Sequence, residues 1–251
     1  MSAVEQRPPI TRLTKVELRK MVDTRAGFWL LFTTFGLCVL VFIILLATGS
    51  GTDVTNTGIL SLAAMPATML VPVLGVLLAS SEFSVRSALT TFTVVPHRGR
   101  VVVAKFFAGL ILSLLVSAAL VLGTLLTGAF LSPPDGAEVA QQSGFGDMVG
   151  RTVLLMVLAM TSGLAFGLLL RNSALAIAAY FMLPTLLAIP FAVIRSIEKA
   201  GPWVTQERWS ELVSQDGLSS QAWAQVGTSS LIWIVAMLAV GLWRLERSEI
   251  K

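Results

Sequence analysis

The sequence predicts an all-α membrane protein with six transmembrane helices and both termini in the cytoplasm. Apolar residues make up 55% of the chain and charged residues only 13%, whereas soluble domains average roughly 45–50% and about 25%. Six uncharged segments are long enough for a helix to cross about 30 Å of hydrocarbon, which takes about 20 residues. Lys and Arg are concentrated on alternate connections between these segments. Together these observations exclude an ordinary water-soluble domain.

The predicted spans are helices because a chain in lipid must satisfy its own backbone groups, which only helices and closed barrels do. Runs such as LCVLVFIILLA lack the two-residue alternation of barrel strands. Small residues at Ala47-Thr48-Gly49 raise the alternative of a cleaved signal peptide, but the first apolar run is longer than the usual 7–15 residues. We therefore expect a retained first helix. The predicted spans cover residues 27–48, 59–80, 106–131, 152–170, 174–194 and 226–243.

Orientation follows from the excess of Lys and Arg on cytoplasmic loops. Fourteen of the 18 basic residues fall before the first span, between the second and third, between the fourth and fifth, or after the sixth. These regions are therefore expected in the cytoplasm, and the net charge of +4 reflects topology rather than nucleic-acid binding. Lys105, at the start of the third span, is expected to extend toward the membrane surface, since a lysine at the bilayer centre is unfavourable.

The N-terminal segment 11–24 is predicted to form an amphipathic helix in the plane of the headgroups. Arg12, Lys15, Arg19 and Asp23 would share one side, with Leu13, Leu18 and Met21 on the other. Glu17 interrupts the apolar side. The Thr14-x-x-Glu17 spacing predicts a capping box, which would place Glu17 in the first turn. The alternative is an irregular basic tail.

The longest predicted cytoplasmic connection, 81–105, is unusually apolar for a simple turn. Val85, Ala88, Leu89 and Phe92 repeat at helical spacing and form one small apolar face before Pro96. Such a face suits a short helix that docks in a groove of a partner. Packing against the chain's own helix ends is the alternative.

Within the spans, two features concern helix packing. Prolines recur in the second and fifth spans, at positions 66, 72, 184 and 190, and kinked helices often line a cavity, although proline is also common in membrane helices. Ala159, Gly163 and Gly167 form a small-xxx-small stripe that predicts close contact with another helix.

The sequence lacks the usual signatures of catalysis and of energy coupling. It has no GxxxxGK[ST] phosphate loop, HExxH, GxSxG or GxGxxG motif, and Cys38 and His97 are each the single residue of their type. The interiors of the predicted spans contain no Asp, Glu, Lys, Arg or His, whereas ion-coupled carriers usually keep such residues in the membrane. We therefore expect no cofactor in this chain, no enzymatic activity, and an energy source outside it.

Three stretches resemble the ABC-2 type permeases, the membrane subunits of bacterial ATP-binding-cassette exporters. They are RLTKVELRKMVDTRAGFWLLF, SSEFSVRSALTTFTVVPHRGRVVVAKFFAGL and GLWRLERSEIK. Glu82, Thr90-Thr91, Pro96, Arg98 and Lys105 occupy positions typical of the family. Where many members have Glu-Tyr-Arg and a glycine, this chain has Glu82-Phe83-Ser84, with Arg86 two residues further on.

The resemblance implies one transmembrane permease domain, 1–251, in the multi-pass inner membrane of a bacterial cell. Residues 1–26 would form an interfacial elbow helix, 27–244 a six-span bundle and 245–251 a cytoplasmic tail. Two copies, or this chain and a similar permease, would assemble with two ATPase subunits that bind ATP and Mg²⁺, and the second and fifth spans would face the central pathway. Membrane lipid is the other expected partner, and no nucleic acid is expected. The implied pathway-lining residues are Met65, Thr68, Met69 and Met182.

The resemblance also implies that segment 82–100 couples the chain to the ATPase. Two alternatives remain at this stage, an ATPase-independent channel or carrier and a membrane scaffold that transports nothing. The implied ATPase-coupling residues are Glu82, Val85, Arg86, Ala88, Leu89, Thr90, Thr91 and Phe92.

Overall fold

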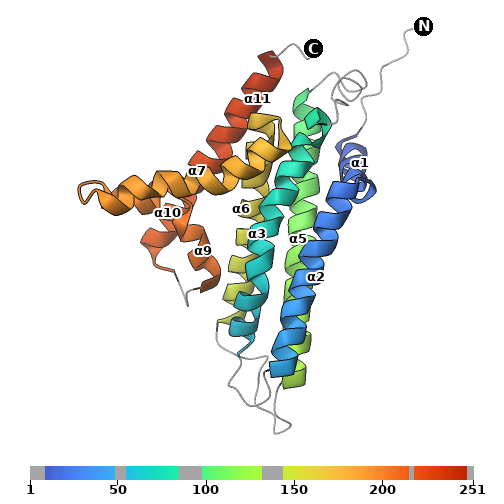
Figure 1. Ribbon diagram of the computed structural model, residues 1–251, viewed down its shortest axis with the longest axis vertical. Coiled ribbons are helices and arrows are strands. Elements are labelled where there is room, and N and C mark those ends of the chain that lie inside the picture. Colours follow the sequence, from blue (N-terminus) through green and yellow to red (C-terminus); the bar gives the residue numbers. More distant parts are fainter. Residues whose placement is uncertain (1–8, 49–54, 85–97, 132–143, 215–217, 248–251) are drawn as a thin grey trace.

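The computed structural model describes residues 9–48, 55–84, 98–131, 144–214 and 218–247. All regular structure in these ranges is helical (Figure 1). The elements are α1 (Ile10–Asp23), α2 (Arg25–Thr48), α3 (Asn56–Ser84), α5 (Arg98–Leu131), α6 (Phe145–Leu170), α7 (Ser173–Val193), η2 (Glu198–Ala200), α8 (Gly201–Val204), α9 (Glu207–Ser214), α10 (Ser220–Ser230), η3 (Leu231–Ala236) and α11 (Met237–Arg247).

Six helical segments in the described ranges are long and apolar enough to cross a membrane, as the sequence predicts. Several continue beyond the predicted spans. Helix α5 begins at Arg98 rather than at residue 106, and α6 begins at Phe145 rather than at residue 152. The predicted boundaries lay beside Lys105 and Arg151 because charges disfavour lipid. The backbone remains helical past both residues, since a charged side chain near a helix end need not interrupt the hydrogen-bonded helix.

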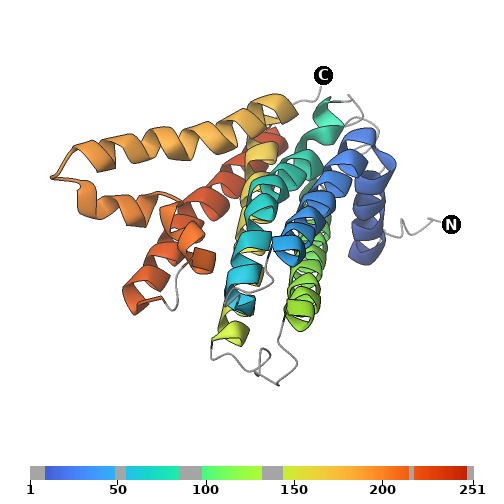
Figure 2. The ribbon, with the colours of Figure 1, turned by 60° about the horizontal axis from the view of Figure 1, so that its bottom comes forward.

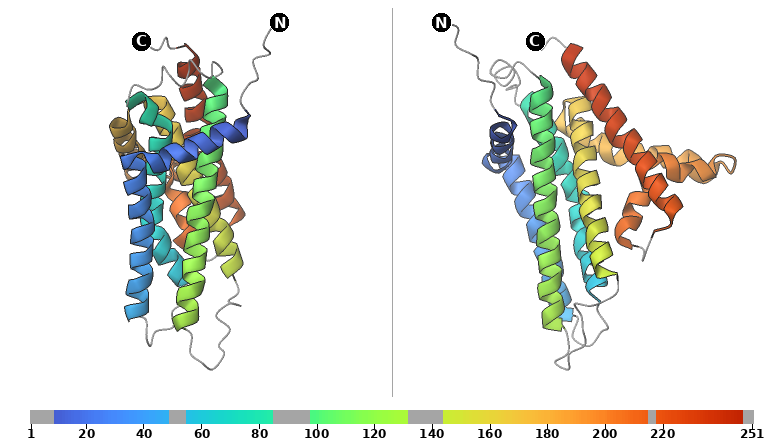
Figure 3. Two further views of the ribbon diagram at one scale, coloured as in Figure 1. Left: turned by 90° about the vertical axis from the view of Figure 1, so that its right-hand side faces the viewer. Right: turned by 180° about the vertical axis from the view of Figure 1, so that it is seen from behind.

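Helices α2, α3, α5 and α6 run side by side along the long axis, with α3 and α6 at the centre (Figures 1 and 3). Helix α1 crosses α5 near one end of this bundle (Figure 3). The end of α3, the start of α5, the α6–α7 turn and the end of α11 lie at that same end (Figure 3). The described helix ends that carry most of the Lys and Arg are thus gathered at one end of the bundle.

The backbones of α3 and α6 approach each other closely, and glycine makes this contact feasible. A Cβ atom on Gly163 would collide with the Pro72 carbonyl, and one on Gly167 would lie 2.7 Å from both the Ala79 Cβ and the Val76 carbonyl oxygen. From the other side, a Cβ on Gly75 would collide with the Met160 carbonyl. The predicted small-residue stripe on α6 is therefore confirmed. It brings the two backbones together, as small residues do in membrane helices.

Helix α7 diverges from the other long helices (Figures 1 and 2). Its buried residues, Ala176 and Tyr180, lie in its first half. There the Tyr180 ring meets Phe166 of α6 edge-on, with the ring centroids 5.5 Å apart. Beyond this contact α7 exposes large apolar side chains, including Leu186, Ile189 and Val193. Most of its apolar surface therefore has no covering within the described part of one chain.

Tryptophan side chains join the connection after α7 to the last span. This connection contains two short helices, α8 and α9. Trp209 is buried and donates to the Ser229 hydroxyl at 3.0 Å. Trp233, in the π-helical segment η3, donates to the Val204 carbonyl at 2.7 Å and stacks on Phe166. Through these hydrogen bonds, the two tryptophans attach the connection after α7 to the last span.

Replacing Trp233 by phenylalanine should lower stability by about 1–3 kcal/mol, because the change leaves the Val204 carbonyl without this buried donor. The aromatic stacking on Phe166 would remain. Thermal unfolding of the purified protein in detergent measures the effect. Trp223→Phe, at a side chain that is 40% exposed, is the matched control and should change little. Equal shifts for the two variants would contradict this role of Trp233.

Candidate functional site

Most of the implied ATPase-coupling residues lie outside the described residues. This holds for Val85, Arg86, Ala88, Leu89, Thr90, Thr91 and Phe92. Glu82 belongs to the last turn of α3, but the structure describes only its backbone and not its side chain. The structure does define where this segment is attached, because it follows the end of α3 and precedes the start of α5.

A buried polar cluster joins α1 to these two helices near the same end. The Lys105 ammonium of α5 donates to Glu17 Oε2 of α1 at 2.7 Å and to the Leu78 carbonyl of α3 at 2.9 Å. Lys20 donates to the other oxygen, Glu17 Oε1, at 2.7 Å. Lys105 is 2% exposed and Glu17 is 4% exposed. We call Glu17, Lys20, Lys105 and the Leu78 carbonyl the Glu17–Lys105 junction.

The junction corrects two sequence-based predictions. Thr14 does not cap α1, because it lies inside the helix and its hydroxyl donates to the Ile10 carbonyl. Glu17 is therefore not in the first turn, and its side chain points into the bundle beside Thr14 and Met21. Lys105 does not extend to solvent but is buried among α1, α3 and α5. Pairing offsets the desolvation of both charges, so neither needs to reach water.

Polar contacts also tie the start of α7 to this end of the bundle. Arg171 adopts a left-handed conformation (φ 54°) between α6 and α7, and the Asn172 side chain caps α7 by accepting from the Leu175 amide. The Ser80 and Ser173 hydroxyls are 2.8 Å apart. A cavity of about 150 Å³ lies among α1, α2, α3 and Ser173. Four helices thus converge beside the junction.

The implied pathway-lining residues lie on the outer surface of the chain. Met65 and Met69 of α3 are 61% and 64% exposed, and Met182 of α7 is 59% exposed. Thr68 lies between the two methionines of α3, and its hydroxyl donates to the Met65 carbonyl. Three of the four residues therefore share one stretch of α3, whereas Met182 lies on the diverging helix α7.

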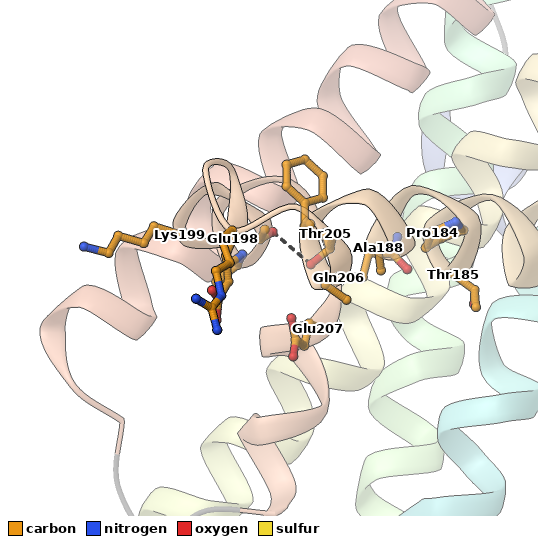
Figure 4. A pocket seen from close by; sticks show the side chains of 13 residues that line it. Pro184, Thr185, Ala188, Glu198, Lys199, Thr205, Gln206 and Glu207 are labelled. Atoms are coloured by element: carbon orange, nitrogen blue, oxygen red, sulfur yellow. Dashed lines mark hydrogen bonds between the residues drawn. The ribbon is translucent and has the colours of Figure 1, made fainter.

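A larger cavity, of about 800 Å³, opens between α7 and the connection that follows it (Figure 4). Its α7 wall includes Pro184, Thr185 and Ala188, and the facing wall includes Thr205 and Gln206. The Thr205 hydroxyl donates to the Gly201 carbonyl at 2.9 Å, and Gln206 donates to Ser162 of α6 at 3.2 Å. The second contact fixes the facing wall against the bundle.

Charged residues of both signs surround this cavity, namely Arg195, Glu198, Lys199 and Glu207. Lys199 extends away from the other labelled side chains, whereas Pro184, Thr185 and Ala188 provide a mostly apolar wall (Figure 4). An apolar wall with a few charged groups, in a volume of roughly 300–1,000 Å³, is typical of small-molecule sites. Sequence reasoning missed this cavity, although Pro184 was the one available signal.

Helix α9, in the connection after α7, contacts α10 through Arg208. Arg208 donates to the Glu211 carboxylate at 2.6 Å and to the Gln225 side chain of α10 at 2.9 Å. The hydrogen bond to Glu211 raises the pKa of the Arg208 guanidinium above its ordinary value. The hydrogen bond from Arg208 to Gln225 links α9 to α10.

Together, the fold and these sites define a multi-pass helical membrane protein with a buried ionic junction near one end and a cavity between α7 and the connection after it. Among the described residues, no group of three or more His, Cys, Asp or Glu side chains could hold a metal ion. No model of a known protein family matches the chain, and no characterised protein matches its sequence.

Proposed function

We propose that this chain is the membrane subunit of an ATP-driven exporter of the ABC-2 type, located in a bacterial inner membrane. The observation that carries the proposal is the placement of charge in the six span-length helices. In their described parts, acidic and basic residues occur near the helix ends, as with Arg25, Lys105 and Arg151, and the middle of each helix has none. Ion-coupled carriers usually need such groups inside the membrane, so the energy would come from another polypeptide.

The proposed attachment point for the ATPase is segment 82–100, between α3 and α5. Its apolar face, formed by Val85, Ala88, Leu89 and Phe92, would enter a groove of the ATPase. Both helices that lead into this segment are anchored in the bundle, α3 by its close contact with α6 and α5 by the Glu17–Lys105 junction. Helix α1 would be the elbow helix, and both termini would be cytoplasmic.

The proposed transport pathway forms between two copies of the chain, or between this chain and a similar permease. The exposed apolar residues of α7 and the methionines of α3 support this arrangement, because large exposed apolar surfaces commonly mark sites of interaction or lipid contact. The 800 Å³ cavity is the proposed place for cargo beside that pathway. Its mixture of apolar and charged residues favours an amphiphilic molecule.

Affinity isolation of the tagged chain from the membranes of its own cells tests the proposal. We expect a smaller ATPase to co-purify in equal numbers, and the isolated complex to hydrolyse ATP. Transport driven by a proton or sodium gradient without that subunit would favour a carrier instead. A complex without ATP hydrolysis would favour a scaffold. Either outcome would contradict the proposed function.

Replacing Phe92 by alanine should weaken retention of the ATPase by about tenfold or more, because burying one phenylalanine side chain contributes roughly 1.5–3 kcal/mol. Arg86→Ala should uncouple ATP hydrolysis from transport. Titration of the purified ATPase onto the chain in lipid nanodiscs measures retention. Lys199→Ala, beside the cavity, is the control and should leave retention unchanged. Full retention and coupling in both variants, with normal expression, would argue against docking at segment 82–100.

A further inference from the structure

The Glu17–Lys105 junction connects three elements that are far apart in the sequence. Lys105 belongs to α5, its carbonyl acceptor Leu78 to α3, and its carboxylate partner Glu17 to α1. Helices α3 and α5 are the two that lead into and out of segment 85–97. One ammonium group therefore binds α1 to both sides of the segment proposed to receive the ATPase.

Packing alone does not account for these residue types. An apolar side chain at position 105 would fill the same space without requiring a charged partner, and buried ion pairs are often no more stabilising than apolar replacements. A lysine near a helix end could also reach the membrane surface. Instead its ammonium has partners in two directions, at 2.7 Å and 2.9 Å. Such directional contacts specify the relative position of three helices, which apolar contacts do less strictly.

The opposite face of α1 carries an ion pair that is exposed to solvent, in contrast to the buried Glu17–Lys105 pair. Arg19 and Asp23 form an ion pair at 3.1 Å within the helix, but their side chains are 80% and 60% exposed. Water screens that pair, and both of its partners belong to α1. The charges on the buried face join α1 to the bundle, whereas those on the exposed face do not.

We infer that Glu17 and Lys105 are positioning residues that make α1 move together with the ends of α3 and α5. Displacement of segment 85–97 by the ATPase is then passed to α1 at the membrane surface. The transmission of ATPase movement to α1 rests on the proposed function, whereas the attachment of α1 to α3 and α5 by the Glu17–Lys105 junction does not. The junction links α1 to α3 and α5, the two helices on either side of the proposed docking segment.

The first test measures hydrogen–deuterium exchange of residues 10–23 in the purified full-length chain in lipid nanodiscs. Lys105→Met should accelerate exchange of α1 by about tenfold or more, since hydrogen bonds to charged groups contribute that much to an opening equilibrium. Arg19→Gln, which removes the exposed pair, is the matched control and should have little effect. Equal exchange rates of α1 in the wild type and in the Lys105→Met variant would contradict the attachment of α1 by the junction.

The second test uses the double variant Glu17→Gln/Lys105→Met, which leaves no unpaired charge from this pair and is therefore expected to fold. Exchange is compared in the co-purified complex, with and without ATP plus vanadate. In the wild type, nucleotide should change exchange both at the end of α3 and in α1. In the double variant, the response should persist in α3 and be lost from α1.

An equal α1 response in both proteins, or no response of α1 in the wild type, would overturn the transmission. A wild-type chain that recruits no ATPase would instead refute the proposed function and the transmission with it. The first test would still decide whether the junction holds α1. The failures of the two ideas are therefore distinguishable.

Discussion

Replacing Gly163 by valine should prevent the chain from accumulating in a folded form. Any Cβ at this position would collide with the Pro72 carbonyl oxygen and would lie 2.8 Å from the carbonyl carbon. These are backbone atoms, so no side-chain rotation relieves the clash. Overpacking costs about 1–3 kcal/mol and sometimes more, and we expect the upper end or beyond, because α3 and α6 would have to separate. Yield and thermal unfolding in detergent measure the effect.

Gly36→Val is the matched control. Gly36 also lies within a membrane-length helix, α2, but an added Cβ there meets nothing within 4 Å. The same change in side chain and in helix propensity should therefore be tolerated. Similar yields and melting temperatures for the two valine variants would contradict close backbone contact between α3 and α6.

Replacing Lys105 by methionine should destabilise the protein by about 3–5 kcal/mol, because removing one partner of a buried pair leaves an uncompensated charge. The remaining charge would be that of Glu17, whose side chain is 6% exposed. Lys20 would still contact its other oxygen, which keeps the expected loss from being larger. Thermal or denaturant unfolding of the detergent-solubilised protein measures the effect.

A double-mutant cycle separates pairing from packing at this site. Glu17→Gln alone should also be destabilising, whereas the double variant with Lys105→Met should recover most of the stability, because both charges are then absent. Strictly additive losses would mean that the two side chains are not paired.

The six membrane-length helices could be predicted from the sequence because their signal is local. A segment such as α2 contains enough consecutive apolar residues to identify it without knowledge of its neighbours. The small-residue stripe on α6 was also readable, since helical spacing alone places Ala159, Gly163 and Gly167 on one face. Its partner was not, because nothing in that spacing identifies Gly75 and Pro72 of α3.

The junction could not be predicted because Glu17 and Lys105 are separated by 88 positions. Read singly, each residue suggested a local explanation, a capping box for Glu17 and an interfacial position for Lys105. Both explanations failed for the same physical reason, because a charge that interrupts an apolar face can be buried when an opposite charge meets it. The interruption of the apolar face of α1 by Glu17 was the visible signal.

The cavity beside α7 depends on where the chain turns after Val193, and the sequence does not determine that path. Proline at position 184 indicated a kink of the kind that often lines a cavity, but Pro66 and Pro72 of α3 gave the same signal at positions that do not line this cavity. The charged residues of the following connection, such as Arg195 and Glu207, are brought together by the tertiary fold. The role of segment 82–100 remains a prediction from the sequence.

Labelling of a single cysteine at position 87 tests most directly whether a cytosolic ATPase drives this chain through segment 82–100. The Ser87→Cys variant, with Cys38 replaced by serine, is treated with a membrane-impermeant maleimide in sealed vesicles of known orientation. We expect labelling in inside-out vesicles stripped of the ATPase, protection when that subunit is restored, and no labelling in right-side-out vesicles. Labelling from the outer face, or labelling that the restored ATPase does not reduce, would contradict the account.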